Sequence, residues 1–246
     1  MDHEKERYFK LSCCCIKAYN LFDMKKMNLV LLLIVLCNVL TAHALAQSIS
    51  AFGGVNYGGF YSVRKAEGHF MKEFDRSFGY LAGIEMSDLK IDSIWNFRIG
   101  LGLEQYGGSF YLRDGGLGGS NYVLGELRKE VLFLTLSPVN FRLFKYAFIR
   151  PGLNLNYELH KKVSGESYSW NMSMSQPIKN DLSAAENFTQ DLNGGILIQF
   201  GYAIEIKKIS IEPRYSFFLG VSRELNNSQA FVSSFRHGFT IGVKLR

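Results

Sequence analysis

The chain has 246 residues, of which 28 are Lys or Arg and 22 are Asp or Glu, so its formal net charge is +6. Because 47% of its residues are hydrophobic, it is not a disordered chain, which would be poor in apolar side chains. Its 24 glycines and 14% aromatic residues, with only four prolines, favour a protein of many strands over a helical bundle.

The N-terminal segment contains the three parts of a secretory signal peptide. Residues 24–28 are basic, residues 29–40 form an apolar run, and Ala44 and Ala46 form an A-x-A cleavage site. The apolar run is too short to cross a bilayer as a helix, which takes about 20 residues. We therefore expect a signal peptide over residues 24–46 and a mature chain that begins at Gln47.

Residues 1–23 precede this unit, and we interpret them as an upstream extension from a start codon assigned too early. All four cysteines lie before the cleavage site, so the mature chain has no thiol for a disulfide or a metal site. A lipoprotein with Cys37 as the lipid acceptor is the weaker alternative, because the bulky Leu36 precedes that cysteine. Six basic and four acidic residues are lost with the N-terminal segment, which leaves 22 against 18. This excess is too small to indicate a nucleic-acid partner.

The mature chain, residues 47–246, alternates apolar with small or polar residues, which is the two-residue period of β-strands. Eight segments show this period: 49–61, 78–86, 95–103, 128–136, 147–159, 196–206, 209–221 and 235–246. The connections between them alternate in length. Residues 62–76, 107–121, 160–193 and 222–233 form long connections, and residues 87–92, 137–145 and 207–208 form short ones. This order predicts an all-β fold, an eight-stranded antiparallel up-and-down transmembrane barrel with short periplasmic turns and long external loops.

The period alone does not decide which face of the strands points inward. A soluble barrel of the lipocalin type would place the apolar face inside. The polar face, however, is rich in small residues and its charges nearly balance, which suits a crowded lumen. The charges assigned to this lumen are Glu85, Arg98, Glu104, Arg128, Glu130, Arg150, Glu158, Glu205, Glu212, Arg214 and Arg236. We expect them to pair into a network that plugs the barrel, and a narrow ion path is the alternative.

The apolar face carries almost no charge, and Lys129 and His237 are its main polar exceptions. Such a face fits lipid, because an exposed charge at mid-depth costs about 2–4 kcal/mol. Aromatic residues near strand ends are candidates for girdles at the membrane surfaces. These are Tyr57, Tyr61, Trp95, Tyr106, Tyr146, Tyr157 and Tyr202. Pro151 and Pro213 lie within strands, where each removes a ladder hydrogen bond, so we expect a β-bulge near each.

Three segments, residues 129–134, 151–154 and 212–215, together with the signal peptide and the eight strands, resemble the PorT-like family of small bacterial outer-membrane β-barrels. The resemblance covers the mature chain. Leu132 stands where the family often has proline, and Arg246 stands where it often has an aromatic chain end. The resemblance implies a place in the bacterial outer membrane. Some relatives are accessories of a secretion system, and many have no assigned activity.

Enzyme chemistry finds little support in the sequence. A catalytic role is left open by three histidines, His69, His160 and His237, because two lipid-modifying enzyme families use eight-stranded barrels. Hydrolysis would need a serine, a histidine and an acid together, and no motif places an acid beside Ser233, Ser234 and His237. None of the glycine-rich stretches has the form of a phosphate-binding loop. We therefore predict no catalytic residue, no metal and no cofactor.

The longest connection, residues 160–193, carries aromatic and sulfur side chains that suit contact with a protein or glycan partner, or packing on the barrel rim. These are Tyr168, Trp170, Met172, Met174 and Phe188. The sequence thus predicts a non-enzymatic outer-membrane barrel that acts structurally or as an accessory of an envelope secretion or assembly machine. Its expected partners are outer-membrane lipid and the barrel-assembly machinery, with no nucleic acid. A narrow channel and a lipid-modifying enzyme are the alternatives.

Overall fold

The computed structural model describes residues 48–62, 71–90, 96–116, 118–182, 189–225 and 232–245. The predicted upstream extension, the signal peptide and its cleavage site at Ala44, Ala46 and Gln47 lie outside these residues, as do Trp95 and Phe188. No helix among the described residues is long and apolar enough to span a bilayer.

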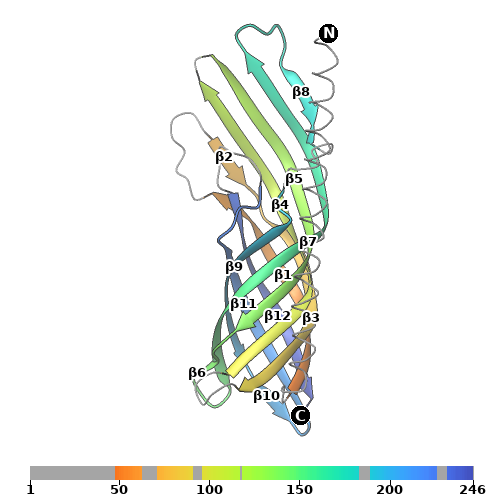
Figure 1. Ribbon diagram of the computed structural model, residues 1–246, viewed down its shortest axis with the longest axis vertical. Helices are drawn as coiled ribbons and strands as arrows, with labels where there is room; N and C mark the ends of the chain where they lie inside the picture. The colour runs from red at the N-terminus through yellow and green to blue at the C-terminus, as the bar shows by residue number, and fades with distance from the viewer. Residues whose placement is uncertain are drawn as a thin grey trace, which may run out of the picture. The chain divides into compact units, whose positions relative to one another are not determined.

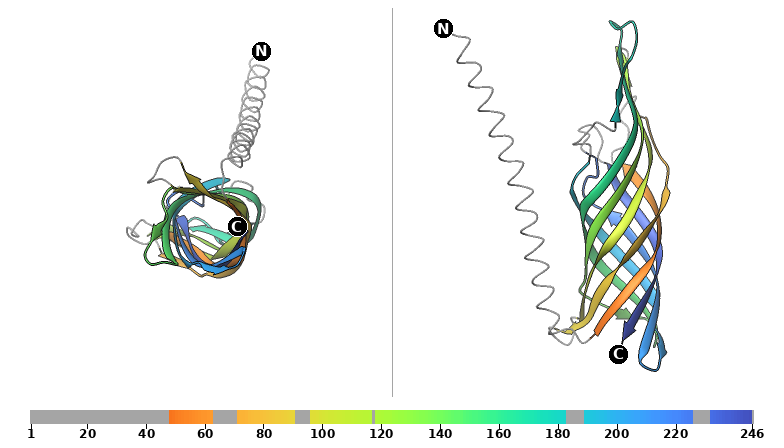
Figure 2. Two further views of the ribbon diagram at one scale, coloured as in Figure 1. Left: turned by 90° about the horizontal axis from the view of Figure 1, so that it is seen from below. Right: turned by 90° about the vertical axis from the view of Figure 1, so that its right-hand side faces the viewer.

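Eight long strands form one closed antiparallel ring (Figures 1 and 2). They are β1 (Ser48–Ser62), β3 (Ser77–Lys90), β4 (Asn96–Gly116), β5 (Gly119–Ser137), β7 (Ala147–Asn171), β9 (Leu192–Tyr202), β11 (Ile209–Gly220) and β12 (Val232–Leu245). Each strand pairs with its neighbour in chain order, and β12 closes the ring on β1 from Ser50↔Lys244 to Ser62↔Val232. Seven of the eight predicted segments lie within one strand each, to within a residue at their ends, and the segment 196–206 is divided at Ala203 between β9 and a short continuation. The eight-stranded barrel is therefore confirmed.

Four short strands extend this ring at its ends. They are β2 (Met71–Phe74), β6 (Phe141–Arg142), β8 (Ile178–Asp181) and β10 (Ile204–Ile206). β2 pairs with β4 and β8 pairs with β7, both beyond the ring, whereas β6 and β10 lie at the end with the short turns. Both described chain ends also lie at the short-turn end, because Ser48 pairs with Ser87 and Leu245 pairs with Ile209, each next to a short turn.

Three strands continue far past their predicted ends and rise above the ring (Figure 1). β4 and β5 pair without a break up to Gly116↔Gly119, and β7 pairs with β5 up to Asn171. We call this three-stranded extension the external blade; it consists of residues 105–116 of β4, 119–130 of β5 and 160–171 of β7. The predicted long loops at 107–121 and 160–193 are therefore largely strand. The alternation of polarity fades there because neither face of this segment must meet lipid.

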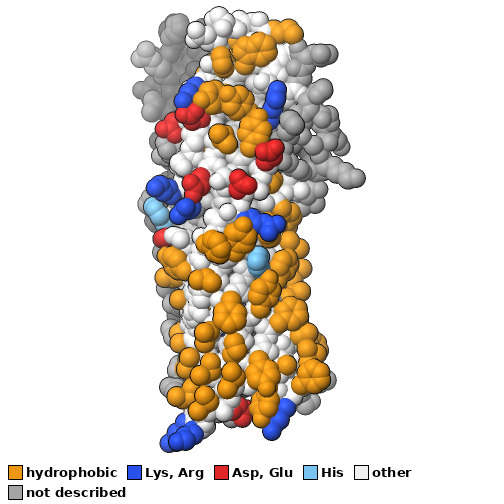
Figure 3. Space-filling model, turned by 180° about the vertical axis from the view of Figure 1, so that it is seen from behind, with side chains coloured by type: hydrophobic (Ala, Val, Ile, Leu, Met, Phe, Trp, Pro, Cys, Tyr) orange, Lys and Arg blue, Asp and Glu red, His pale blue; other side chains and the backbone are white. Residues whose placement is uncertain are grey.

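The outer wall of the ring carries a continuous belt of apolar side chains, each more than a third exposed. The apolar belt consists of Ile49, Val55, Phe78, Tyr80, Ile84, Leu103, Leu136, Leu153, Leu155, Ile196, Phe200, Tyr202, Tyr215, Phe217, Leu219, Phe239, Ile241 and Val243. Figure 3 shows this belt on one face, with charged side chains gathered beyond it on the side of the blade. The residues between these positions point inward and are mostly polar and buried. A closed barrel with an apolar outer wall is the architecture of outer-membrane proteins, so the soluble lipocalin-type alternative is wrong.

A β-bulge at Leu159 changes the orientation of β7 where the strand leaves the ring. Glu130 pairs with His160 and the next residue, Val131, pairs with Glu158, so Leu159 has no partner in β5. Below the bulge the odd-numbered residues of β7 face outward, and above it the even-numbered residues do. Leu159 itself is half exposed.

The prediction of a bulge is wrong for Pro213, past which the register with β9 and β10 does not change. Beside Pro151 the neighbouring chain holds one extra residue between the pairs Leu136↔Leu153 and Phe141↔Ile149, as expected of a bulge. Pro151 pairs in register with Ile198, and Pro213 pairs in register with Ile241. On its other side each proline lies at an interruption in the neighbouring strand. For Pro151 this is the gap between β5 and β6, and for Pro213 it is the break at Ala203 between β9 and β10. A proline without a donor is tolerated at such a gap because no ladder hydrogen bond is needed there.

We expect Leu153→Arg to destabilise the barrel by about 2–4 kcal/mol, because it places a charge in the middle of the apolar belt. Leu153 is 61% exposed, and Leu124 on the outer face of the blade is 55% exposed. Leu124→Arg is therefore the matched control, with the same side-chain change outside the belt and an expected effect below about 1 kcal/mol. The measurement is urea unfolding of the barrel refolded in lipid vesicles. Equal losses for both variants would show that the belt does not face lipid.

Candidate functional site

The lumen near the short-turn end is filled by two carboxylates and three guanidinium groups. Glu212 Oε2 accepts hydrogen bonds from Arg214 at 2.7 Å, Arg150 at 2.9 Å and Arg98 at 3.3 Å. Glu85 binds Arg98 at 2.7 Å and Arg214 at 2.9 Å. These side chains come from β3, β4, β7 and β11 and are no more than 7% exposed. The name lower cluster is used for these five residues, which join opposite walls of the ring.

Small and aromatic residues make room for the lower cluster. A Cβ atom at Gly242 would lie 2.8 Å from Arg214 Nη2, so glycine is what lets this guanidinium lie flat against β12. Arg150 stacks on the ring of Phe148 at 3.5 Å and donates from Nε to Asn140 Oδ1 at 3.2 Å. The charges are therefore desolvated but held by aromatic, amide and carboxylate partners together.

Arg236 lies in the middle of the lumen. Its guanidinium is stacked between the rings of Phe218 at 3.8 Å and Tyr106 at 4.0 Å, and its Nε lies 3.2 Å from Glu104 Oε1. Asn56 donates to the same carboxylate oxygen at 2.7 Å. Tyr106, expected in a girdle at the membrane surface, is thus a lumen residue and only 1% exposed.

A third group of charges closes the lumen toward the blade. Lys129 Nζ lies 2.8 Å from Glu158 and 3.0 Å from Glu224, and it is fully buried. Glu224 also accepts hydrogen bonds from Ser234 at 2.6 Å and Tyr106 at 3.0 Å. The name upper cluster is used for Lys129, Glu158 and Glu224. Lys129 therefore points into the lumen, and its predicted place on the lipid face is wrong.

The upper cluster includes a residue that the sequence could not single out. Glu224 follows β11 in the connection that precedes β12, and its segment folds back into the barrel, with Glu224 N donating to Val232 O at 2.7 Å. A connecting segment has no two-residue period, so no pattern marks one of its acids as inward-facing.

An apolar core lies above the upper cluster and seals the end of the ring. Residues from β1, β4, β5 and β12 meet two residues of connecting segments, Leu182 and Leu225. The members are Phe60, Tyr106, Phe110, Leu112, Leu127, Val131, Leu182, Leu225 and Val232, all at most 6% exposed. Polar clusters and apolar core together occupy most of the lumen among the described residues, and a cavity of about 40 Å³ remains between Glu85 of the lower cluster and Arg236.

Three of the predicted lumen charges lie elsewhere. Arg128 and Glu130 face outward, because the leucines that follow them on β5 at positions 132, 134 and 136 fix that side of the strand toward lipid. Arg128 pairs with Glu126 at 2.7 Å on the exposed surface. Glu205 is exposed on β10 at the short-turn end. The other eight predicted residues lie in the lumen.

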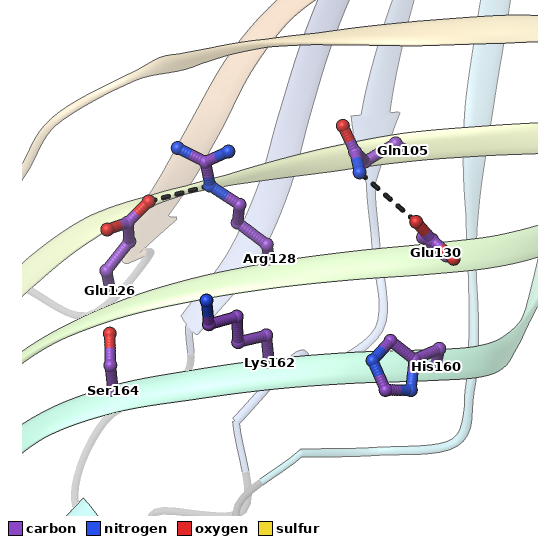
Figure 4. A pocket seen from close by; sticks show the side chains of 7 residues that line it. All are labelled: Gln105, Glu126, Arg128, Glu130, His160, Lys162 and Ser164. Atoms are coloured by element: carbon purple, nitrogen blue, oxygen red, sulfur yellow. Dashed lines mark hydrogen bonds and ion pairs between the residues drawn. The ribbon is translucent and has the colours of Figure 1, made fainter. Parts of the chain in front are cut away.

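The outer face of the blade begins with a polar pocket of about 430 Å³ just beyond the apolar belt. Its lining comes from β4, β5 and β7 and consists of Gln105, Glu126, Arg128, Glu130, His160, Lys162 and Ser164 (Figure 4). Gln105 Nε2 donates to Glu130 at 3.2 Å. The bulge at Leu159 is what turns the side chains of β7 toward this pocket. We call this cavity the outer pocket.

Farther along the same face, tyrosines form a ladder across three strands. The ring of Tyr122 stacks on that of Tyr168 at 4.5 Å and lies 6.3 Å from that of Tyr111. Trp170 and Met172, two of the predicted contact residues, are exposed near the tip of the blade, at 40% and 73%. Tyr168 and Trp170 thus lie on a strand, not in a loop, and Met172 and Met174 lie in the turn that follows.

The serine–histidine constellation is not assembled. Ser234 points into the lumen toward Glu224, whereas His237 lies on the outer wall, where its Nδ1 is 3.0 Å from the hydroxyl of Tyr215. The barrel wall separates the two side chains. Among the described residues, no group of three or more His, Cys, Asp or Glu could hold a metal ion.

The sequence matches no protein-family model and no curated protein, so the resemblance to the PorT-like family stays a prediction. The comparison with solved structures matches several bacterial surface and outer-membrane proteins over most of their length. Neisserial surface protein A is 8% identical with a TM-score of 0.38, and covers 80% of this chain and 96% of its own. OprG of Pseudomonas aeruginosa is 10% identical with a TM-score of 0.31, covering 81% and 95%. Ail of Yersinia pestis is 9% identical with a TM-score of 0.30, covering 80% and 98%.

We expect Glu212→Gln to destabilise the barrel by about 3–5 kcal/mol, because it leaves three buried guanidinium groups with one carboxylate. The matched control is Glu126→Gln, the same change in an ion pair whose side chains are 43% and 56% exposed. Its expected effect is below about 1 kcal/mol. Urea unfolding in vesicles measures both. A Glu212→Gln barrel as stable as the control would contradict the central role of the lower cluster.

A hydrogen bond from Lys179, and a second from Tyr168, hold the pKa of Glu166 below its ordinary value of 4.5. Because the pKa of Glu166 is lower in the folded state, its ionised carboxylate stabilises the β7–β8 pairing at pH values above the unfolded-state pKa. This stabilisation is lost as the pH falls through the folded-state pKa. We expect Lys179→Met to raise the pKa of Glu166 toward its ordinary value. Carboxyl-carbon NMR of the refolded barrel measures it, and an unchanged pKa would contradict the assignment.

Proposed function

We propose that this chain is a non-enzymatic, integral outer-membrane barrel whose lumen is permanently filled, and that it acts through its external blade. In this role it is a structural component or an accessory of an envelope secretion or assembly machine. The observation that carries the proposal is the contrast between the two parts. The lumen is occupied by the lower cluster, Arg236, the upper cluster and an apolar core, whereas the blade is long and exposed.

The composition of the blade supports a binding role. A rigid sheet that stands beyond the membrane offers fixed side chains at low entropic cost, and tyrosine and tryptophan combine a large apolar area with a polar tip. Tyr111, Tyr122 and Tyr168 are half-buried in their ladder, and Trp170 is exposed beyond it. The resemblance to secretion accessories agrees with contacts at this end. Folding of the barrel would need the barrel-assembly machinery, as for other outer-membrane barrels.

The proposal is tested by shortening the blade without disturbing the ring. Leu112 pairs with Val123, so replacing residues 113–122 by an Asn-Gly turn closes the β4–β5 hairpin in register and keeps the apolar core. We expect this variant to fold normally in its bacterium, and the cells to lose protein export to their surface or resistance to detergent.

The control for this variant is the shift of its gel band on boiling, which reports a folded barrel independently of function. Normal export and normal detergent resistance in cells that carry a heat-shifting, shortened barrel would contradict a function of the blade.

A further inference from the structure

The outer pocket contains two like charges that face each other, and only one of them forms an ion pair with a carboxylate of the pocket. Arg128 on β5 is directly opposite Lys162 on β7, and both side chains are exposed on the outer face. Opposed side chains of neighbouring strands have their Cβ atoms about 5 Å apart, and like charges in this arrangement destabilise a sheet. A pair of this kind needs an anion to be favourable.

The same two strands carry a second pair of like charges, which shows how the chain neutralises such a pair internally. Lys129 is directly opposite Lys161 on the inner face. Glu158 lies 2.8 Å from the first of these lysines and 3.6 Å from the second, and Glu224 adds a further carboxylate. The inner pair thus has its anions within the protein.

The outer pair, Arg128 and Lys162, is only partly neutralised by carboxylates of the protein. Glu126 binds Nε of Arg128 at 2.7 Å, and no ion pair among the described residues involves the two terminal nitrogens of this guanidinium, whose side chain lines the pocket (Figure 4). Glu130 keeps its negative charge in the same pocket, but it accepts a hydrogen bond from Gln105 and forms no ion pair with Arg128 or Lys162. Within the described part of the chain, Lys162 has no carboxylate partner. Two cationic groups therefore remain available, and a guanidinium beside an ammonium is a suitable site for a phosphate group.

The position of the outer pocket identifies the source of the phosphate. On the same outer face, the next cross-strand pair toward the membrane after Gln105 and Glu130 is Leu103 and Leu132. The lipid-exposed part of the outer wall begins at these two leucines. Charged groups immediately beyond the apolar region of a membrane protein lie at the level of lipid headgroups. The phosphate most accessible to the pocket thus belongs to a lipid whose acyl chains lie along the apolar belt.

Above the pocket, the chemistry of the outer face changes again. Tyr122 is six residues from Arg128 on the same face of β5, about 20 Å along the strand. The ladder of Tyr111, Tyr122 and Tyr168 presents aromatic surface, with Trp170 exposed beyond it. Aromatic side chains with polar tips suit the mixed apolar and hydroxylated faces of sugar rings. From the membrane outward, the face is apolar, then cationic, then aromatic.

We propose that the outer face of β4, β5 and β7 binds a phosphorylated glycolipid of the outer leaflet, with Arg128 and Lys162 on its phosphate and the tyrosine ladder along its sugars. The acyl chains lie against the apolar belt. This inference rests on the proposed function to the extent that it requires the barrel to be in a membrane with its blade outside.

The test uses the mature barrel refolded in detergent and a fluorescent lipopolysaccharide as the probe, with binding followed by anisotropy. We expect the double variant Arg128→Gln, Lys162→Gln to bind at least about tenfold more weakly. The matched control is Arg142→Gln, Lys145→Gln, which removes two exposed cations at the short-turn end and is expected to leave affinity unchanged. Equal affinity for the two double variants would overturn the proposal.

Further probes separate the phosphate from the sugars and the lipid from a free anion. Removal of phosphate from the probe is expected to weaken binding to the wild type as much as the double variant does. Tyr122→Val is expected to weaken binding of the full lipopolysaccharide and not of its lipid A part. Displacement of the probe by inorganic pyrophosphate would overturn the assignment to a lipid.

Each variant is first checked for the band shift on boiling. A missing shift in the wild type contradicts the proposed function, and a normal shift with unaltered binding contradicts this inference alone.

Discussion

An eight-stranded ring leaves room only for side chains, and this constraint governs the rest of the structure. Every charge that points inward must find its partner within the lumen, because little water remains to solvate it. Glu212 meets three arginines from three strands, and Lys129 meets acids from β7 and from a connecting segment. These contacts fix opposite walls of the barrel to one another. The side chains of the interior thereby hold the barrel together, which is why we propose that the function lies at the surface.

The polarity of the outer wall changes at the level of the bulge at Leu159. Below it, lipid excludes charge, and the wall is the apolar belt. Above it, the same strands continue as the external blade with charged and aromatic side chains on their outer face. The bulge at Leu159 lies at this level and turns His160 and Lys162 outward. One extra residue in β7 thus allows a single strand to serve the lumen below and the outer pocket above.

The two-residue period predicted the eight strands and the direction of most lumen charges, because lipid outside and a packed lumen inside impose opposite polarity on adjacent residues. The period gave wrong predictions where the strands no longer have lipid on one side and the packed lumen on the other. Arg128 and Glu130 are outside because the wall at their level no longer meets lipid, so an outward charge has little cost. The length of the blade was missed for the same reason. Glu224 was missed because its place depends on a tertiary fold of a connecting segment. The signal peptide lies outside the described residues and stays a prediction.

The central claim is that the lumen is filled and that the blade, not a pore, carries the function. Its most direct test is single-channel recording of the purified barrel in a planar lipid bilayer, with protein that shifts on boiling. The account predicts no steady openings. Steady openings that are lost on substitution of Arg98 or Arg214 would contradict it, because the lower cluster would then line an ion path instead of closing it.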